Sequence, residues 1–184
     1  MKNKKKIGLA ALLGIILCVG LATTLAYFTD SKTQENTITM GKVSIELREP
    51  EFEKNEDNHI LNIIPNKPIT KDPTVSVGAD SSDAYIRLNI SYEGLDAKQI
   101  AELKQGIQLK SGWKMVGNYI YYNQIAKAND VLVAFDTIVI PDWGNEEADL
   151  TFKMNIKAEA VQADYFDPTK EDGYIIDWPG VSFK

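Results

Sequence analysis

Apolar and polar residues alternate over long stretches of the chain, with the period of two that is typical of half-buried β-strands. The clearest run covers residues 150–160, and a second covers residues 84–92. The apolar, β-branched stretches 74–77 and 131–140 predict two further strands, the second of which ends before Pro141. Strands therefore dominate the expected secondary structure.

A β-hairpin is predicted around the dipeptide Gly117-Asn118. Aromatic and apolar residues flank it on both sides, at 113–116 and 119–122. This arrangement favours a two-residue turn of type I′ or II′, because glycine and asparagine adopt positive φ angles more readily than other residues.

One short helix is predicted after residue 95. Asp96 can cap its N-terminus, and Gln99 follows three residues later, as in a capping box. Gly106 suits the C-terminal end of the helix. The expected buried stripe consists of Ile100, Leu103 and Ile107.

The apolar pattern changes its phase near residue 40. Ile38 and Met40 are in phase with each other, and a second apolar set is out of phase with them. That second set consists of Val43, Ile45 and Leu47. One extra residue around Gly41-Lys42 brings both sets onto one face, so we predict a β-bulge in this N-terminal strand.

Together these elements predict an all-β protein. Several short strands, regularly spaced turn signals and a single helix are typical of an antiparallel β-sandwich with one short insert helix. Greek-key and jelly-roll connections both fit the pattern, and the spacing of strands and turns does not choose between them.

The first 26 residues predict an export signal. Four lysines precede residue 7, and residues 7–25 are uncharged and almost wholly apolar. Thr24 and Ala26 are small residues at the spacing that a signal peptidase reads, so cleavage is expected between Ala26 and Tyr27. The apolar run nearly reaches the ~20 residues that span a bilayer, which makes an uncleaved membrane anchor the alternative. The only expected membrane contact is through the uncleaved signal.

Residues 27–184 are then expected to form a single domain, large enough to bury a core. Of the 20 Lys and Arg, 4 lie in the signal, so 16 remain against 26 Asp and Glu, a net charge of −10. This acidic balance argues against nucleic acid and anionic membranes as partners. The only cysteine, Cys18, lies in the signal, so the mature chain has no thiol for a disulfide, a nucleophile or a zinc ligand.

Motifs for catalysis are absent from the sequence. The one histidine, His59, lies in a polar stretch, and there is no H-E-x-x-H, no G-x-S-x-G and no glycine-rich phosphate loop. We therefore expect no catalytic residue and no cofactor.

Carboxylates near the C-terminus are weak candidates for a calcium site. Calcium takes six to eight oxygen ligands, which loops can supply, but the spacing here does not match an EF-hand. The candidates are Asp164, Asp167, Glu171 and Asp172. A solvated acidic loop is the favoured alternative.

Aromatic residues gather in the same part of the chain. They are Tyr165, Phe166, Tyr174, Trp178 and Phe183. They either cover one face of a sheet or form a binding patch, and the first interpretation is favoured because apolar surface is usually buried within its own chain.

Several blocks of the sequence resemble the TasA/camelysin family of secreted proteins. The most specific block is T-L-A-Y-F-T-D-S-K-T-Q-E-N-T-I-T-M-G-K-V-S-I-E-L, at the end of the signal. It is followed by N-K-P-I-T-K-D-P-T-V-S-V-G and D-A-Y-I-R-L. The later N-Y-I-Y-Y-N, I-V-I-P and I-K-A-E-A-V-Q-A-D are similar to clostridial-type members of the family.

The resemblance implies a jelly-roll-like sandwich, a signal cleaved by a SipW-type signal peptidase, and secretion to the matrix or cell surface of a Gram-positive bacterium. It also implies a biofilm-matrix or cell-surface fibre subunit. In TasA-like fibres the N-terminal segment of one subunit completes the sheet of the next, so we expect a head-to-tail polymer in which residues 27–47 are the assembly segment. Its key residues are Tyr27, Phe28, Ile38, Met40, Gly41, Val43, Ile45 and Leu47.

Two other functions stay open at this point. The camelysin branch of the family is described as a surface metalloendopeptidase, although this chain lacks the imidazoles that a zinc site typically uses. A monomeric surface adhesin is the third interpretation. For the segment itself, a disordered tail or an intramolecular first strand is the alternative to donation.

Overall fold

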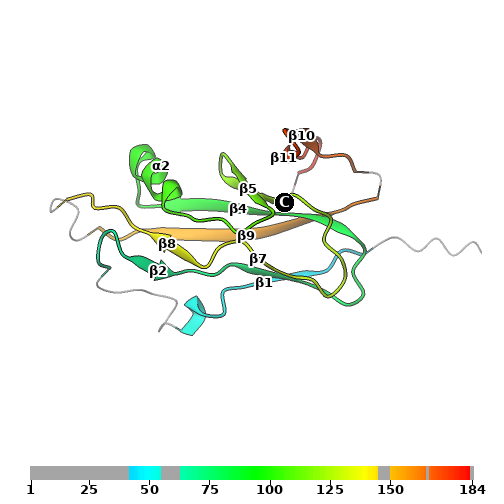
Figure 1. Ribbon diagram of the computed structural model, residues 1–184, viewed down its shortest axis with the longest axis horizontal. Helices are drawn as coiled ribbons and strands as arrows, with labels where there is room; N and C mark the ends of the chain where they lie inside the picture. The colour runs from blue at the N-terminus through cyan, green and yellow to red at the C-terminus, as the bar shows by residue number, and fades with distance from the viewer. Residues whose placement is uncertain (1–41, 55–62, 145–149, 165, 183–184) are drawn as a thin grey trace, which may run out of the picture. The chain divides into compact units, whose positions relative to one another are not determined.

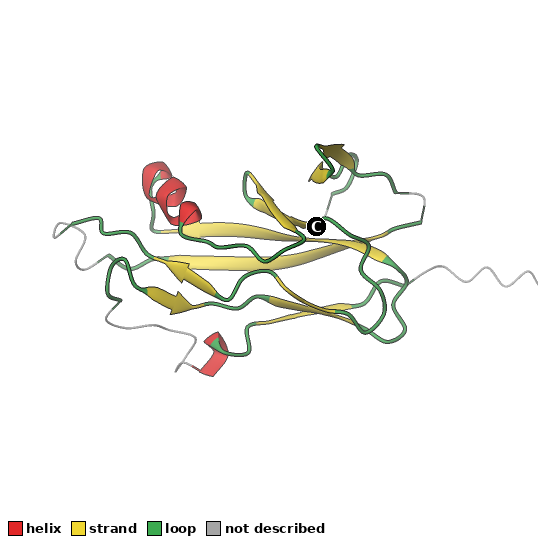
Figure 2. Ribbon diagram, in the orientation of Figure 1, coloured by secondary structure: helices red, strands yellow, loops and turns green. Residues whose placement is uncertain are grey.

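The computed structural model divides the chain into two compact units, residues 1–39 and 40–184. It describes residues 42–54, 63–144, 150–164 and 166–182, all of which belong to the second unit. This unit consists mostly of antiparallel strands, with one α-helix among the described residues (Figure 2). The prediction of an all-β protein with a short helix is confirmed, whereas the jelly-roll-like sandwich stays a prediction.

The helices are the 3-10 turn η1 (Phe52–Lys54) and α2 (Ala97–Gln105). The strands are β1 (Ile45–Arg48), β2 (Pro68–Thr70), β3 (Thr74–Val77), β4 (Ala84–Glu93), β5 (Trp113–Val116), β6 (Tyr119–Tyr122), β7 (Val131–Val133), β8 (Thr137–Val139), β9 (Lys153–Gln162), β10 (Thr169–Glu171) and β11 (Tyr174–Asp177).

The largest sheet has four strands in the order β5-β6-β4-β9. β4 and β9 pair along ten residues each, from Ala84 opposite Gln162 to Glu93 opposite Lys153. The predicted strand at 150–160 is therefore displaced, because β9 begins three residues later and ends two residues later than expected. The expected alternation is nevertheless present along its first half, where exposed and half-buried residues follow each other.

The predicted hairpin is confirmed as β5 and β6, with Trp113 opposite Tyr122 and Val116 opposite Tyr119. Gly117 has a φ of 61°. Asn118 is not among the residues of positive φ, so the turn has the glycine-first pattern of type II′ rather than the two positive φ angles of type I′.

The prediction of one continuous strand at 131–140 was wrong. In the second layer these residues form two short strands, β7 and β8. β7 pairs with β3 in the order β1-β3-β7, and β8 pairs with β2. Both pairs keep one register, since Thr70 lies opposite Thr137 and Thr74 lies opposite Val133. The two pairs are thus one antiparallel ladder with an interruption.

The interruption has a physical cause at Pro73. Proline has no N–H to complete the ladder opposite Ala134, although the Ala134 N–H still donates to the Pro73 carbonyl at 3.0 Å. The Ala134 carbonyl instead accepts from the Lys110 N–H at 2.8 Å. The break in the strand was not readable from residues 131–140, because the residue that causes it lies on the partner strand.

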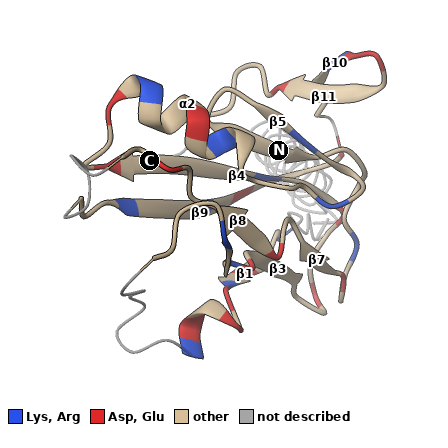
Figure 3. Cartoon of the chain, turned by 60° about the vertical axis from the view of Figure 1, so that its left-hand side comes forward, with Lys and Arg blue, Asp and Glu red and all other residues tan. Residues whose placement is uncertain are grey.

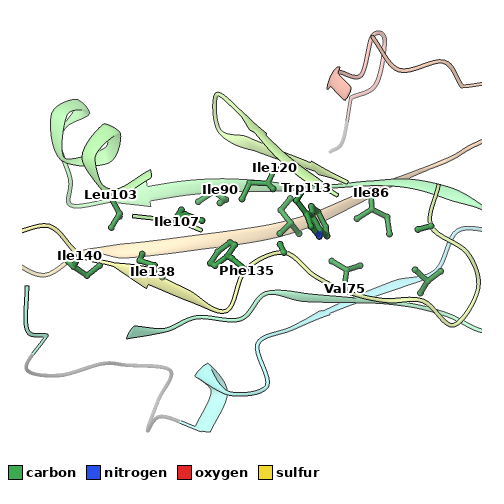
Figure 4. Packing of buried hydrophobic residues seen from close by; sticks show 14 residues of the cluster. Val75, Ile86, Ile90, Leu103, Ile107, Trp113, Ile120, Phe135, Ile138 and Ile140 are labelled. Atoms are coloured by element: carbon green, nitrogen blue, oxygen red, sulfur yellow. The ribbon is translucent and has the colours of Figure 1, made fainter. Parts of the chain in front are cut away.

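A shared hydrophobic core joins the two layers. Figure 1 shows β4 and β9 above the strands of the second layer, and Figure 4 shows side chains from both meeting between them. Ile86 and Leu88 of β4 are fully buried, as are Val75 of β3 and Phe135 of the interrupted ladder.

Helix α2 has the predicted capping box. The Asp96 carboxylate accepts from the Gln99 N–H at 2.8 Å, and the Gln99 side chain accepts from the Asp96 N–H at 2.9 Å. Within the stripe, Leu103 and Ile107 are buried, whereas Ile100 is only half-buried. Gln99, which the pattern did not place inside, is buried as well.

Gly106 ends the helix as predicted, but for a different reason. Its φ of −78° is open to any residue, so no left-handed conformation requires glycine. A Cβ at this position would lie 2.1 Å from the Val139 carbonyl oxygen. Glycine is needed because β8 approaches the backbone closely, and the Val139 N–H donates to the Gly106 carbonyl at 3.1 Å.

Candidate assembly edge

The four-stranded sheet has one long edge that no described segment pairs with. β9 is its last strand, and among the described residues its only strand partner is β4. An edge strand of ten residues offers a row of main-chain donors and acceptors, which can bind another strand by β-augmentation. We call the free side of β9 the open edge.

The hydrogen-bond pattern shows which residues face the open edge. The N–H groups of Ala84 and Ile90 on β4 donate toward the β6 side, at 3.0 and 2.9 Å, so the even-numbered residues of β4 face away from β9. The Ala163 N–H donates to the Asp83 carbonyl at 2.8 Å, which places odd-numbered residues on the β4–β9 boundary. Antiparallel strands alternate residue by residue, so the main-chain groups of the even-numbered β9 residues point outward. These residues are Met154, Ile156, Ala158 and Ala160.

The side chains of the same residues form the core face of β9. They pack against the main core but are only partly buried, whereas Ile86, Leu88 and Ile90 on the neighbouring β4 are at most 1% exposed. The core is therefore less completely covered at the open edge than one strand further in. An added strand would cover apolar surface there, in addition to forming main-chain hydrogen bonds.

The edge strand of the other layer runs beside the open edge. Cα atoms of β1 approach those of β9 within 8 Å, and Ile45 and Leu47 of β1 are partly buried against the same core. Glu46 and Arg48 point away from the core and are exposed. The open edge is thus flanked by a second edge strand rather than by a connecting loop.

The opposite side of the domain is closed by residues 106–112, which we call the closing loop. It receives a hydrogen bond from Val139 and donates one from Lys110 to Ala134, both in the second layer. At its other end, the Gly112 carbonyl accepts from the Asn123 N–H at 2.8 Å, beside β6. The closing loop therefore joins both layers through main-chain bonds.

The described chain begins at one end of the strands, next to the turn that joins β3 and β4. The Ser82 N–H donates to the Lys42 carbonyl and the Gly78 N–H to the Ser44 carbonyl, both at 2.9 Å. β9 ends at the same turn, since Gln162 lies opposite Ala84. We call this end of the domain the entry end, because the chain enters the domain there and β1 runs away from it.

A buried ion pair fastens β9 to β4 on the outer face of the sheet. The Arg87 Nε donates to the Glu159 carboxylate at 2.8 Å, and their side chains are 7% and 4% exposed. The Arg87 guanidinium also lies over the rings of Tyr119 and Trp178, at 4.1 and 4.5 Å from their centroids. β9 is therefore a firmly held edge strand.

Residues 166–182, including β10 and β11, cover this ion pair and form a second cluster. Phe166 packs against Tyr85 with ring centroids 5.9 Å apart, and Trp178 packs against Tyr121 at 6.0 Å. Burial raises the pKa of Tyr121 above its ordinary value. For Phe166 and Trp178 the interpretation as sheet cover is confirmed, whereas Tyr174 is exposed.

The predicted assembly segment is only partly described. Ile45 and Leu47 face the core as expected, and Ser44 continues the β1–β3 register opposite Gly78, but Val43 is not in a strand. The predicted strand is thus shorter than expected at its described end. The remaining predicted residues lie outside the described residues: Tyr27, Phe28, Ile38, Met40 and Gly41, the cleavage residues Thr24 and Ala26, and His59, Tyr165 and Phe183.

The four calcium candidates are not brought together. Asp164, Asp167, Glu171 and Asp172 are all exposed, and Asp172 occupies the turn between β10 and β11 with a φ of 49°. Within the described ranges, no three His, Cys, Asp or Glu side chains are grouped so that they could hold a metal ion. The structure gives the calcium hypothesis no support.

Sequence reasoning missed the Arg87–Glu159 pair, although a signal was present. The alternation of β4 and β9 places both residues on the outer faces of neighbouring strands, and a sheet face with several aromatic residues is rarely left in water. The burial of Lys71 was also not predicted. Its ammonium lies 2.8 Å from the Glu49 carboxylate and 3.9 Å from the Phe52 ring centroid.

Charges of both signs are interspersed over the described residues (Figure 3). In the part of the chain that the structure describes, no helix has the length and apolar character needed to cross a membrane. No family model matches the chain, and neither a curated protein nor a solved structure matches it significantly. Its function must therefore be inferred from its own residues.

Proposed function

We propose that the chain is a secreted fibre subunit of a Gram-positive biofilm matrix or cell surface. Cleavage by a SipW-type signal peptidase frees the N-terminal segment, which adds to the open edge of the next subunit. The contact is head-to-tail, so it propagates into a polymer instead of closing into a pair. The observation that carries the proposal is the open edge itself, with its outward main-chain groups and its partly covered core.

The length of the free segment supports this proposal. Residues 27–41 are fifteen residues that precede the described chain after cleavage. Fully extended, they reach about 50 Å. The ten residues of β9 extend over about 33 Å. The segment is thus long enough to follow the whole open edge of a neighbour and still connect to its own domain.

Signal cleavage supplies a switch for assembly. Before cleavage, residues 7–25 hold the segment at the membrane, where its N-terminal side is not free to reach a neighbouring subunit. After cleavage at Tyr27, the segment can pair through main-chain hydrogen bonds, and the resemblance of this block to the TasA/camelysin family supports the same role.

The first experiment compares protein that begins at Tyr27 with protein that lacks residues 27–41. Electron microscopy and light scattering against time should show filaments only for the longer protein, while circular dichroism shows that both are folded. Filaments of unchanged yield from the shortened protein would refute donation by this segment.

A substitution on β9 tests the acceptor side. Ala158→Pro removes an N–H that points to the open edge, so it leaves the ladder with β4 intact while blocking an added strand. Ala158→Ser is the matched control, because it changes the side chain at the same position and keeps the main-chain N–H. We expect filaments from the serine variant alone, and equal assembly by both folded variants would exclude β9 as the acceptor.

A further inference from the structure

We propose that the added segment lies antiparallel to β9 of the next subunit, in the register that places Glu35 opposite Lys157. This inference rests on the proposed function and specifies its geometry. It follows from the direction in which the described chain enters its own domain, and from the faces and charges of β9.

The direction follows from the entry end. β1 runs away from this end, because Ile45 pairs with Val77 and Arg48 with Thr74. β9 runs toward it, since Gln162 is paired at its last position with Ala84. Strands of both layers follow the same long direction (Figure 1). A segment that continues β1 outward from Lys42 therefore runs opposite to the β9 strands of all subunits that share its polarity.

Head-to-tail assembly along the strands keeps that polarity from one subunit to the next. The segment then meets the neighbouring subunit at the end where β9 begins, and it pairs antiparallel. A segment that instead folds back on its own domain reverses direction and lies parallel to its own β9. The orientation of the pair therefore distinguishes donation to a neighbour from an intramolecular strand.

The register follows from side-chain character. Residues opposite each other in an antiparallel pair share a face, so Ile38 and Met40 belong on the core side. With Glu35 opposite Lys157, Ile38 faces Met154 and Met40 faces Phe152, both of which are partly buried against the core. On the outer face this register brings the Glu35 carboxylate to the Lys157 ammonium, whose side chain is 57% exposed and already lies 3.6 Å from the Glu159 carboxylate.

The same register places Thr37 opposite Asn155. Asn155 is an odd-numbered residue of β9, so its main-chain groups bond to β4, and Thr37–Asn155 is a pair without mutual hydrogen bonds. Such pairs bring Cα atoms to about 4.5 Å, within the range that a disulfide can bridge. The chain that begins at Tyr27 contains no cysteine, so engineered thiols report on this contact alone.

The test mixes protein carrying Thr37→Cys with protein carrying Asn155→Cys under mild oxidation during assembly. Non-reducing electrophoresis and peptide mapping should show a disulfide between the two chains. The control replaces Asn155→Cys by Val161→Cys, which lies on the same face of β9 near the entry end, partly buried against the second cluster, and should give no crosslink with Thr37→Cys.

The outcomes separate this inference from the proposed function. Filaments that crosslink Thr37→Cys to Asn155→Cys support both. Filaments that crosslink only through Val161→Cys overturn the antiparallel register and leave the fibre proposal standing. A single-chain variant with both Thr37→Cys and Val161→Cys that crosslinks internally without forming filaments overturns both.

A charge exchange tests the register independently. Lys157→Glu should slow elongation about two- to fivefold, as expected for like charges opposite each other on a sheet. Because the new carboxylate also lies beside Glu159, urea denaturation of the monomer must show that the domain keeps its stability. Adding Glu35→Lys to the same chain should restore the rate, because the pair is then reversed rather than removed. A double variant that elongates no faster than Lys157→Glu alone would overturn the predicted register.

Discussion

The two sides of this domain differ in how the space between the layers is closed. On one side the closing loop bonds to β8, to the interrupted ladder and to the end of β6. On the other side β9 and β1 lie next to each other as two edge strands, and among the described residues neither has a second strand partner. The same core is therefore sealed by main-chain bonds on one side and only partly covered on the other.

This difference shows how a small β-domain can fold alone and still associate. Proteins that stay monomeric commonly protect long edges with proline, bulges, lysines or charges that point inward. β9 has no proline, its pairing with β4 shows no register shift, and its core-facing residues are uncharged. Its lysines lie on the outer face, where an added strand does not bury them.

The largest expected effect concerns the fastening of β9. Glu159→Gln keeps the shape of the side chain but removes a carboxylate charge 2.8 Å from the buried Arg87. Breaking a buried ion pair in this way should lower the free energy of unfolding by about 3 kcal/mol, measured by urea denaturation. Because the pair ties β9 to β4, this variant weakens the attachment of the edge strand and leaves the hydrogen bonds of the closing loop unchanged.

The control for that variant replaces both partners. Arg87→Leu combined with Glu159→Leu removes the two charges together, which often costs little when apolar residues fill the space. We expect the double variant to be more stable than Glu159→Gln. A Glu159→Gln protein within about 1 kcal/mol of the parent would show that the pair contributes little to holding β9.

Local sequence patterns predicted the elements that depend only on residues close to one another in the sequence. The strand at 84–92, the capping box of Asp96 and the turn at Gly117 each depend on residues a few positions apart, and each is present, although residues 84–88 are buried on both faces of the sheet instead of alternating. The break in 131–140 depends on Pro73, and the need for glycine at 106 depends on Val139. These contacts join residues more than 30 positions apart, so no local pattern contains them.

The open edge was also predictable only in part. The period of two indicated that residues 150–160 have a core face, but a strand in the middle of a sheet and one at its edge show the same alternation. Only the strand order makes β9 an edge. The Arg87–Glu159 pair spans 72 positions. The alternation placed both residues on outer strand faces, but it did not indicate that their two strands are neighbours.

The second effect concerns the closing loop. Gly106→Ala places a Cβ 2.1 Å from the Val139 carbonyl oxygen, so β8 and the loop must separate. Such overpacking should cost about 2 kcal/mol of unfolding free energy. The matched control is Gly117→Ala, which meets no atom within 4 Å and carries only the penalty of a positive φ, about 1 kcal/mol. Equal losses would show that the loop is not tightly seated on β8.

The smallest effect is a pH dependence at Tyr92, on the core face of β4 opposite Met154 of β9. Burial raises the pKa of Tyr92 to about 12, and its buried hydroxyl has no hydrogen-bond partner. The unfolded chain loses this proton near pH 10, before the folded protein does, so stability falls as pH rises from about 10 to 12. Burial also raises the pKa of Tyr121 and Tyr122, which contribute in the same direction.

Tyr92→Phe should therefore leave stability at pH 7 unchanged or slightly higher, because it removes a buried hydroxyl without a partner. Its stability should fall less steeply than that of the parent between pH 10 and 12, in urea denaturation at each pH. Parallel pH profiles would show that Tyr92 is as accessible to water as in an unfolded chain. If a neighbour's segment covers Met154 in filaments, the parent tyrosine should ionise at still higher pH after assembly, and difference absorbance of tyrosinate in parent and Tyr92→Phe filaments measures that change.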